Sequence, residues 1–367
     1  KEASMKRTLI NIAILSTIIG TGMAQAGGWD RSGQDTSIIV KDGNLLEVTS
    51  VSVAPKITGK YTGASAGTST GDVTPDYSFT NIAFRTDIND DFSIALIQDE
   101  PFGAGVDWAT GTGEYTLVKA KIDTKATTLL IAYDLDDVTV FGGLKNQTFG
   151  ASAQVPLSAT TIYAITSTPE TSLGYVFGAA IERPEIALRV ALTYHTKITH
   201  DVAIVETLIG AGASTTPSTL TADTPSSFNL DFQTGVAANT LLFGTIRSVK
   251  WTQTELTPTV YKASTGQSLK KFTSDTMSYS IGLGRKFSDE WSGAVTYGTE
   301  AAEGTAGSPL GPTDGYSKMG VGLTYAADQA NITLGVQQIN NGSTVAPKAN
   351  MSGNTTMVTA VKVAYKF

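Results

Sequence analysis

The chain has 367 residues, a net charge of −7 and no cysteine. Disulfide bonds therefore cannot hold its fold together, and an acidic chain without a basic stripe is unsuited to nucleic acid. Beyond the N-terminus there is no apolar run of the ~20 residues that a membrane-spanning helix requires. The 41% share of hydrophobic residues nevertheless excludes a disordered chain.

The first 26 residues have the pattern of a secretory signal peptide. A basic start, an apolar core and a small-residue cleavage site follow one another at Lys6-Arg7, Leu9–Ile19 and Ala24-Gln25-Ala26. The apolar core is too short to cross a bilayer as a helix. We therefore expect residues 1–4 to be an upstream remnant, export of the chain, and a mature protein that starts at Gly27.

Alternating apolar and small or polar residues predict β-strands from about residue 45 to the C-terminus. Clear cases are 173–181, 186–194, 319–325 and 357–367. Such alternation suits a soluble sandwich as well as a membrane barrel. In a barrel the apolar set faces lipid, and the Gly, Thr and Lys set faces the lumen.

The lengths of the connections between these segments favour the barrel. Six connections are short, at 89–90, 136–137, 183–185, 236–238, 288–289 and 327–328. Seven are long and rich in Gly, Ser, Thr and Pro, at 58–75, 102–124, 148–170, 197–225, 252–272, 299–313 and 340–355. Long and short alternate throughout, so thirteen connections join fourteen strands. Short periplasmic turns and long outer loops are typical of outer-membrane barrels.

The predicted fold is thus an all-β transmembrane antiparallel barrel of about fourteen strands over 45–367, after a short N-terminal hatch at 27–44. Aromatic residues near strand ends fit the two interfacial girdles of such a barrel. They are Trp29, Tyr77, Tyr133, Tyr194, Trp251, Trp291, Tyr325 and Tyr365. The C-terminal Phe367 lies on the lipid-facing phase and resembles the signal that the barrel-assembly machinery reads.

Four stretches resemble the FadL/TodX-type transporters of long-chain fatty acids. They are TDINDDFSIALIQDEPFGAGVDW (86–108), SLGYVFGAAIERPEIALRVALTYH (172–195), TPSSFNLDFQTGVAANTLLFGTIRSVKW (224–251) and FSDEWSGAVTYG (287–298). The resemblance runs from about Gly28 to Phe367. It implies fourteen strands, an N-terminal hatch and uptake of hydrophobic compounds across the outer membrane of a Gram-negative bacterium.

The resemblance also implies a ligand groove between the third and fourth outer loops, here 148–170 and 197–225. Both loops are more apolar than solvated loops need to be. The candidate groove residues are Phe149, Leu157, Ile162, Tyr163, Ile204, Val205, Leu208 and Ile209. The last four suggest an amphipathic helical turn. Alternatively, these residues only pack the two loops together.

A kinked third strand forms the lateral exit in the family. Here that strand is predicted from Phe92 to about Pro101, and Pro101, Gly103 and Gly105 close it. Proline interrupts a ladder and glycine permits bends, although the same residues suit an ordinary loop entry. The family's Asn-Pro-Ala motif is missing and the hatch is short, so we expect a lumen that is less fully plugged.

A fatty-acid carboxylate needs a cation in the lumen, and arginine forms bidentate bonds to it. Arg31, in the hatch, and Arg189, on the lumen phase of its strand, are the candidates; Lys145, Lys286 and Lys362 share that phase. The alternative is that each arginine pairs with an acid such as Glu182 and holds the structure together.

Catalysis has little support. His195 and His200 lack the spacing of helical metal ligands, and no motif nominates a nucleophile. We therefore expect no enzyme, metal or cofactor, but a monomeric, passive transporter in contact with outer-membrane lipid. Long-chain fatty acids are the leading ligand, ahead of aromatic hydrocarbons. A general diffusion porin is the main alternative, and a surface adhesin is a third possibility.

Overall fold

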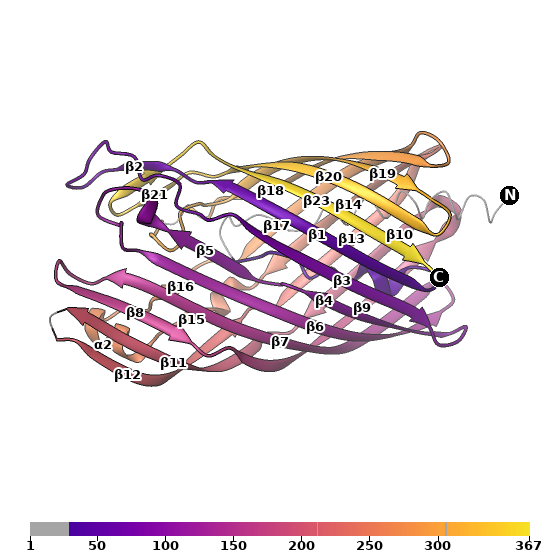
Figure 1. The fold of residues 1–367 in the computed structure, drawn as a ribbon. Helices are drawn as coiled ribbons and strands as arrows, with labels where there is room; N and C mark the ends of the chain where they lie inside the picture. Colours follow the sequence, from indigo (N-terminus) through magenta and orange to yellow (C-terminus); the bar gives the residue numbers. More distant parts are fainter. Residues whose placement is uncertain (1–28, 211, 305–306) are drawn as a thin grey trace.

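The computed structural model describes residues 29–210, 212–304 and 307–367 (Figure 1). The predicted signal peptide at 1–26 lies outside the described residues. In the described chain, fourteen long antiparallel strands pair in sequence order, and the last pairs with the first to close a barrel. They are β1 (Leu45–Lys56), β3 (Tyr77–Asp87), β4 (Phe92–Asp99), β6 (Lys119–Leu135), β7 (Val138–Pro156), β9 (Glu170–Arg183), β10 (Leu188–His195), β13 (Ser227–Ala237), β14 (Thr240–Val249), β17 (Thr276–Lys286), β18 (Trp291–Glu300), β19 (Tyr316–Ala326), β20 (Ala330–Asn341) and β23 (Asn354–Lys366).

The six short connections predicted from the sequence join hairpins at one end of the barrel, where the C-terminus also lies (Figure 1). One of the two two-residue turns joins β6 to β7 through Asp136 and Asp137, and Asp136 has a φ of 53°. Aspartate tolerates this left-handed conformation better than most residues. The fourteen-stranded barrel inferred from alternating connection lengths is therefore confirmed.

Two of the predicted long loops are largely strand. The 148–170 segment contains the end of β7 and β8 (Thr161–Ser167), and the 197–225 segment forms β11 (Ile198–Gly210) and β12 (Ser214–Thr224). β11 pairs with both β8 and β12. The predicted helical turn at 204–209 is wrong, because the segment alternates buried and exposed residues with the two-residue period of a strand.

Shorter elements complete the outer end and the interior. The strands are β2 (Gly59–Tyr61), β5 (Gly103–Asp107), β15 (Glu255–Leu256), β16 (Lys270–Lys271), β21 (Thr344–Ala346) and β22 (Ala349–Met351). The helical turns are η1 (Ser37–Val40), η2 (Trp108–Thr110), η3 (Pro184–Ile186), η4 (Trp251–Gln253) and the α-helix α2 (Thr259–Thr265). Among the described residues, no helix has the length and apolar character to cross a membrane.

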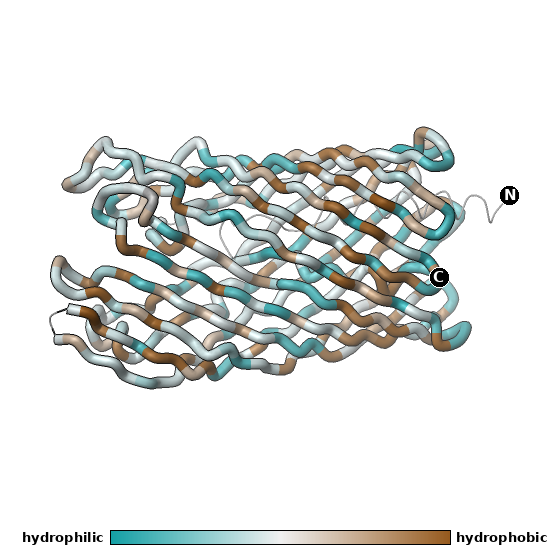
Figure 2. The backbone as a smooth tube through the Cα atoms, in the orientation of Figure 1, coloured by the Kyte–Doolittle hydropathy of each residue, from teal (hydrophilic) through white to brown (hydrophobic). Residues whose placement is uncertain are grey.

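The two faces of each strand differ as the alternation predicts. On β23, Met357, Val361 and Val363 point outward, whereas Val358 and Lys362 are buried inside. Figure 2 shows apolar residues recurring along the strands between paler, more polar ends. An outward apolar band of this kind faces lipid in membrane barrels, where an arginine or lysine at mid-bilayer costs ~2–4 kcal/mol.

The aromatic residues do not all join the girdles. Tyr133, Trp291, Tyr325 and Tyr365 are exposed on the outer wall. Trp29 and Trp251, by contrast, are buried in one apolar cluster inside the molecule, so their assignment to the girdles is wrong. Each precedes or follows a strand, and no alternation determines which way its side chain points.

Residues 29–44 lie inside the barrel. Ile38, Ile39 and Val40 of η1 pack in one cluster with inward side chains of the wall such as Leu130 and Ala95. The short N-terminal segment therefore packs against the inner face of the wall, and the expectation of a less fully plugged lumen stays a prediction. The small inward residues of β4, β6 and β10 leave room for it.

Candidate functional site

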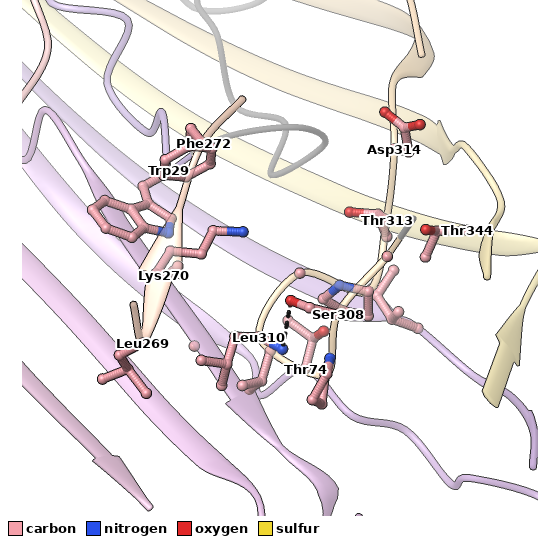
Figure 3. Close-up of a pocket in the computed structure, with 18 of the residues that line it drawn as sticks. Trp29, Thr74, Leu269, Lys270, Phe272, Ser308, Leu310, Thr313, Asp314 and Thr344 are labelled. Atoms are coloured by element: carbon pink, nitrogen blue, oxygen red, sulfur yellow. Dashed lines mark hydrogen bonds between the residues drawn. The ribbon is translucent and has the colours of Figure 1, made fainter. Parts of the chain in front are cut away.

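A cavity of about 630 Å³ lies toward the outer end of the barrel (Figure 3). This is within the range of ~300–1,000 Å³ typical of ligand sites. Its walls come from the N-terminal segment, the inner faces of β1, β3 and β5, and the outer segments 267–273 and 307–314. Residues distant in sequence thus enclose one space that is large enough for a small organic molecule.

Aromatic rings form one side of this cavity. Trp29 and Phe272 line it, with their ring centroids 5.1 Å apart at 76°. Behind them, Trp251 lies 5.0 Å from Phe272, and Phe102 lies 5.5 Å from Trp251. Aromatic pairs with tilted or edge-to-face geometry are favourable beyond the area they bury, so this wall is a contiguous apolar surface.

Lys270 brings a positive charge into this otherwise apolar side of the cavity. Its side chain extends past Trp29 and Phe272 toward the middle of the cavity, and Thr313, Asp314 and Thr344 lie on the far side (Figure 3). The ammonium lies 4.5 Å from the centroid of the Phe272 ring, a cation–π contact. Burial lowers the pKa of Lys270 below its usual 10.5, and the charge of Glu303 partly opposes this effect.

The carboxylate of Glu303 acts on this cation, and that of Asp314 lies beside Glu303. Burial raises the pKa of Glu303, and the charge of Asp314 raises it further. Asp314 accepts hydrogen bonds from the backbone N–H groups of Glu303 and Gly304 at 2.8 and 2.9 Å. The cavity therefore combines an aromatic wall with one lysine and a small acidic pair, which is suited to a molecule that has an apolar body and a polar end.

The third barrel strand is broken beside the cavity. β4 ends at Asp99, and β5 resumes at Gly103. The N-terminal segment hydrogen-bonds to this break: Gly103 N–H donates to Trp29 O at 2.6 Å, and Arg31 N–H donates to Pro101 O at 3.0 Å. The interruption predicted at Pro101 is thus present, and a distant segment of the chain satisfies its free backbone groups.

The wall is incomplete next to this break. β3 pairs with β4 only between Ile82 and Asp87, and in the described pairings β3 from Tyr77 to Asn81 bonds to β1 alone. Tyr77 of β3 and Gly105 of β5 both line the cavity. The cavity consequently reaches a part of the barrel wall where no strand ladder closes it.

The candidate groove residues divide between two faces. Phe149, Tyr163 and Ile204 are buried in the cluster that contains Trp29, and Leu157 and Leu208 pack against it. Val205 and Ile209 are exposed on the outer face, and Ile209 pairs with Ile162. The pairing of β8 with β11 explains the division, because successive strand residues point to opposite faces.

The two candidate arginines are engaged by acids of the protein. Arg31 lies 3.1 Å from Glu100 and 3.5 Å from Asp123, and its guanidinium stacks over Tyr77 at 4.5 Å. Arg189 donates to Val40 O at 3.0 Å and lies 3.4 Å from Glu182. Both arginines therefore tie the N-terminal segment to the barrel wall.

A buried ion cluster holds the same segment near the short turns. The carboxylate of Glu47 lies 2.8 Å from both Lys41 and Lys362. Arg85 donates to Gly43 O at 2.6 Å and to Ile39 O at 3.3 Å. These charges are compensated within the protein, so they fasten the segment rather than line an open pore.

The histidines lie in separate networks. His195 Nδ1 is 2.9 Å from Lys145 Nζ, and His200 Nδ1 is 2.8 Å from Glu170. Sequence reasoning missed Lys270 and Phe272, which lie in the predicted 252–272 loop. The signal that could have drawn attention to them is the sequence Leu269-Lys270-Lys271-Phe272, which is unusually apolar and basic for a solvated loop.

The closed barrel, its apolar exterior and the amphipathic cavity at its outer end define the class of outer-membrane β-barrel channels. Residues 38–366 match the family described as outer membrane protein transport protein (OMPP1/FadL/TodX), and the chain belongs to this family. It is thus a transport channel for hydrophobic compounds in the outer membrane of Gram-negative bacteria, and not an enzyme.

Solved structures share the fold at low sequence identity. A FadL homologue of Pseudomonas aeruginosa is 14% identical with a TM-score of 0.77, over 96% of this chain and 98% of the other. The toluene transporter TodX of Pseudomonas putida is 12% identical with a TM-score of 0.64, over 96% of this chain and 97% of the other. No curated protein sequence matches the chain significantly.

Proposed function

We propose that this channel takes up long-chain fatty acids, or other carboxylates with an apolar tail, by passive diffusion through the outer cavity. The observation that carries the proposal is the position of Lys270, a half-buried cation beside an aromatic wall. An apolar ligand without charge would gain nothing from a buried ammonium, whose desolvation is costly. A carboxylate would restore its lost hydration through a charge-assisted hydrogen bond.

In this proposal, the apolar tail enters a groove along the inner face of the continuous sheet that β7, β8, β11 and β12 form. Phe149, Tyr163 and Ile204 supply the buried side of that groove, and Leu157 and Leu208 flank it. The outward residues Ile162, Val205 and Ile209 belong to the rim. Burial of a tail is favourable by about 0.8 kcal/mol for each CH₂ removed from water.

The exit that we propose is lateral, at Pro101, Gly103 and Gly105. Its support is that Tyr77 and Gly105 line the cavity on either side of the unpaired wall. The N-terminal segment, acting as the hatch, blocks the direct route to the periplasm. Arg31 stands beside this exit and is a second contact for the carboxylate once Glu100 releases it; Arg189, deeper and bound to Val40, fastens the hatch.

The remaining assignments concern partners. We propose a monomer surrounded by outer-membrane lipid, with Phe367 as the residue read by the barrel-assembly machinery. In support, Phe367 stacks on Phe84 with ring centroids 5.9 Å apart, and its exposed fraction is 52%. A ring in this position is accessible at the seam where β23 meets β1.

Binding of a fluorescent long-chain fatty acid to the refolded barrel, together with single-channel conductance, tests the proposal. Saturable binding with little steady conductance is expected, because in this proposal the N-terminal segment blocks the direct route through the lumen. If toluene binds and fatty acid does not compete with it, the ligand of this channel is a hydrocarbon and not a carboxylate. A large steady conductance without binding of either would instead favour a general diffusion porin.

A further inference from the structure

Glu206 is a buried carboxylate that joins three separate outer segments. Its exposed fraction is 1%, although it lies on β11 beyond the closed part of the barrel. The hydroxyl of Tyr163 on β8 donates to Oε2 at 2.9 Å, and that of Ser218 on β12 donates to Oε1 at 2.8 Å. Burying a carboxylate is costly unless such bonds compensate it.

The third segment is the start of α2. The backbone N–H groups of Val260 and Tyr261 donate to Glu206 Oε2 at 2.9 and 3.1 Å. These are among the donors that a helix leaves free in its first turn, and Pro258, at the N-cap, provides no side-chain cap. Glu206 therefore supplies from another strand the cap that the local sequence lacks.

The segment held in this way, residues 255–272, is bonded largely to itself. Leu269 N–H donates to Leu256 O at 2.9 Å, and Ser268 Oγ donates to Glu255. α2 has no buried residue. The residues of this segment that line the cavity are Tyr261, Gln267, Ser268, Leu269, Lys270, Lys271 and Phe272. The segment therefore has hydrogen bonds of its own and covers one side of the cavity.

We infer that residues 255–272 form a lid over the outer cavity and that Glu206 is the positioning residue that holds this lid closed. Tyr163, whose hydroxyl binds Glu206, also packs edge-on against Tyr261 with ring centroids 5.0 Å apart. The aromatic contact and the carboxylate act at the same point of the lid. Opening requires the loss of these contacts and of those that Leu256 and Phe272 make in the apolar cluster.

The inference rests on the proposed function for its meaning, but its test needs no ligand. The chain contains no cysteine, so Leu256→Cys places a single thiol in the lid at a position that is 3% exposed. Thr215→Cys, on the exposed part of β12, reports accessibility outside the lid. A membrane-impermeant maleimide then measures opening directly.

Glu206→Ala in the Leu256→Cys background is expected to speed labelling by about tenfold or more, because several hydrogen bonds of a charged group are lost. Glu206→Gln is expected to speed labelling less than Glu206→Ala does, since its carbonyl can still accept two of the three Oε2 donors and its amide can donate to Ser218. Labelling of Thr215→Cys should not change, which shows that the substitution does not alter the reaction of the maleimide with an exposed thiol.

Ligand kinetics complete the test. With fluorescent fatty acid, Glu206→Ala should raise the association and dissociation rates together, with a smaller change in Kd. If Leu256→Cys labels at the same rate with and without Glu206→Ala, Glu206 does not hold the segment closed and the proposed lid is wrong. If Glu206→Ala speeds labelling but the parent barrel binds no fatty acid, the lid proposal stands and the proposed ligand is wrong.

Discussion

The guanidinium of Arg31 occupies the space that a side chain at residue 103 would need. A Cβ on Gly103 would lie 2.3 Å from Arg31 Cζ. The close approach lets Arg31 reach Glu100 on the same broken strand and stack over Tyr77 of the neighbouring strand. One glycine and one arginine thereby connect the N-terminal segment to both sides of the incomplete wall.

Gly103→Ala should therefore destabilise the barrel by displacing Arg31 from Glu100. Overpacking of this kind costs ~1–3 kcal/mol, to be measured as the free energy of unfolding in urea. Gly105→Ala is the matched control, because its Cβ would approach only Pro75 Cγ at 3.2 Å. Equal losses in the two variants would show that the position of Arg31 does not depend on the glycine.

Lys270→Met should weaken binding of a fatty acid by roughly tenfold to a hundredfold, since a hydrogen bond to a charged group contributes ~1.5–3 kcal/mol. Binding of a neutral hydrocarbon should stay within about twofold. Lys262→Met, on the exposed face of α2, removes the same charge outside the cavity and serves as the control. Fluorescence titration of both variants measures the difference. A loss of the same size for the neutral ligand would indicate damage to the cavity.

The pH dependence of binding should follow Lys270. Its ammonium exists below its pKa, which burial lowers from 10.5 against the opposing charge of Glu303. Affinity for a carboxylate is therefore full at neutral pH and is lost as the pH rises through that lowered pKa, before 10.5 is reached. Titration with Glu303→Gln should shift the loss to still lower pH, because the charge that raises the Lys270 pKa is gone. A flat profile up to pH 10.5 would contradict the contact.

Turn chemistry and alternation were sufficient to predict the barrel from the sequence. Asp136-Asp137 and the other short connections mark one end, and the period of two assigns inner and outer faces along strands such as β23. For residues 204–209 of the outer segments the same reasoning failed, because a helical period was assumed where the chain forms a strand. In a helix, Ile204, Val205, Leu208 and Ile209 would lie on one face. In the strand that these residues form, Val205 and Ile209 instead point to the outer face.

The site itself depends on contacts between distant residues. Pro101 signals a break in the third strand, but no local pattern indicates that Trp29 and Arg31 supply its hydrogen-bond partners. Lys270 is similar, since its orientation follows from the pairing of Leu269 with Leu256 and from the Glu206 contact with α2. Sequence periodicity specifies faces of regular strands and leaves the direction of loop side chains undetermined.

Glu47→Gln should loosen the N-terminal segment. The substitution leaves Lys41 and Lys362 buried without their shared carboxylate, and loss of one partner from a buried ion pair costs ~3–5 kcal/mol. Lys362→Met is the milder comparison, because Glu47 keeps Lys41. Limited proteolysis within residues 29–44 and single-channel conductance should both increase in the order wild type, Lys362→Met, Glu47→Gln. If proteolysis and conductance increased more in Lys362→Met than in Glu47→Gln, repulsion between Lys41 and Lys362 would be unimportant.

Two neighbouring residues on β11 test which face of the outer extension binds the tail. Ile204 is 3% exposed within the apolar cluster, and Val205 is 44% exposed on the outside. Ile204→Ala should cost ~2–5 kcal/mol locally and reduce fatty-acid affinity several-fold, whereas Val205→Ala should change neither. Titration with ligands of increasing chain length makes the comparison sharper: the Ile204 effect should grow with tail length if the tail lies against that face. A loss confined to Val205→Ala would place the tail on the outer rim instead.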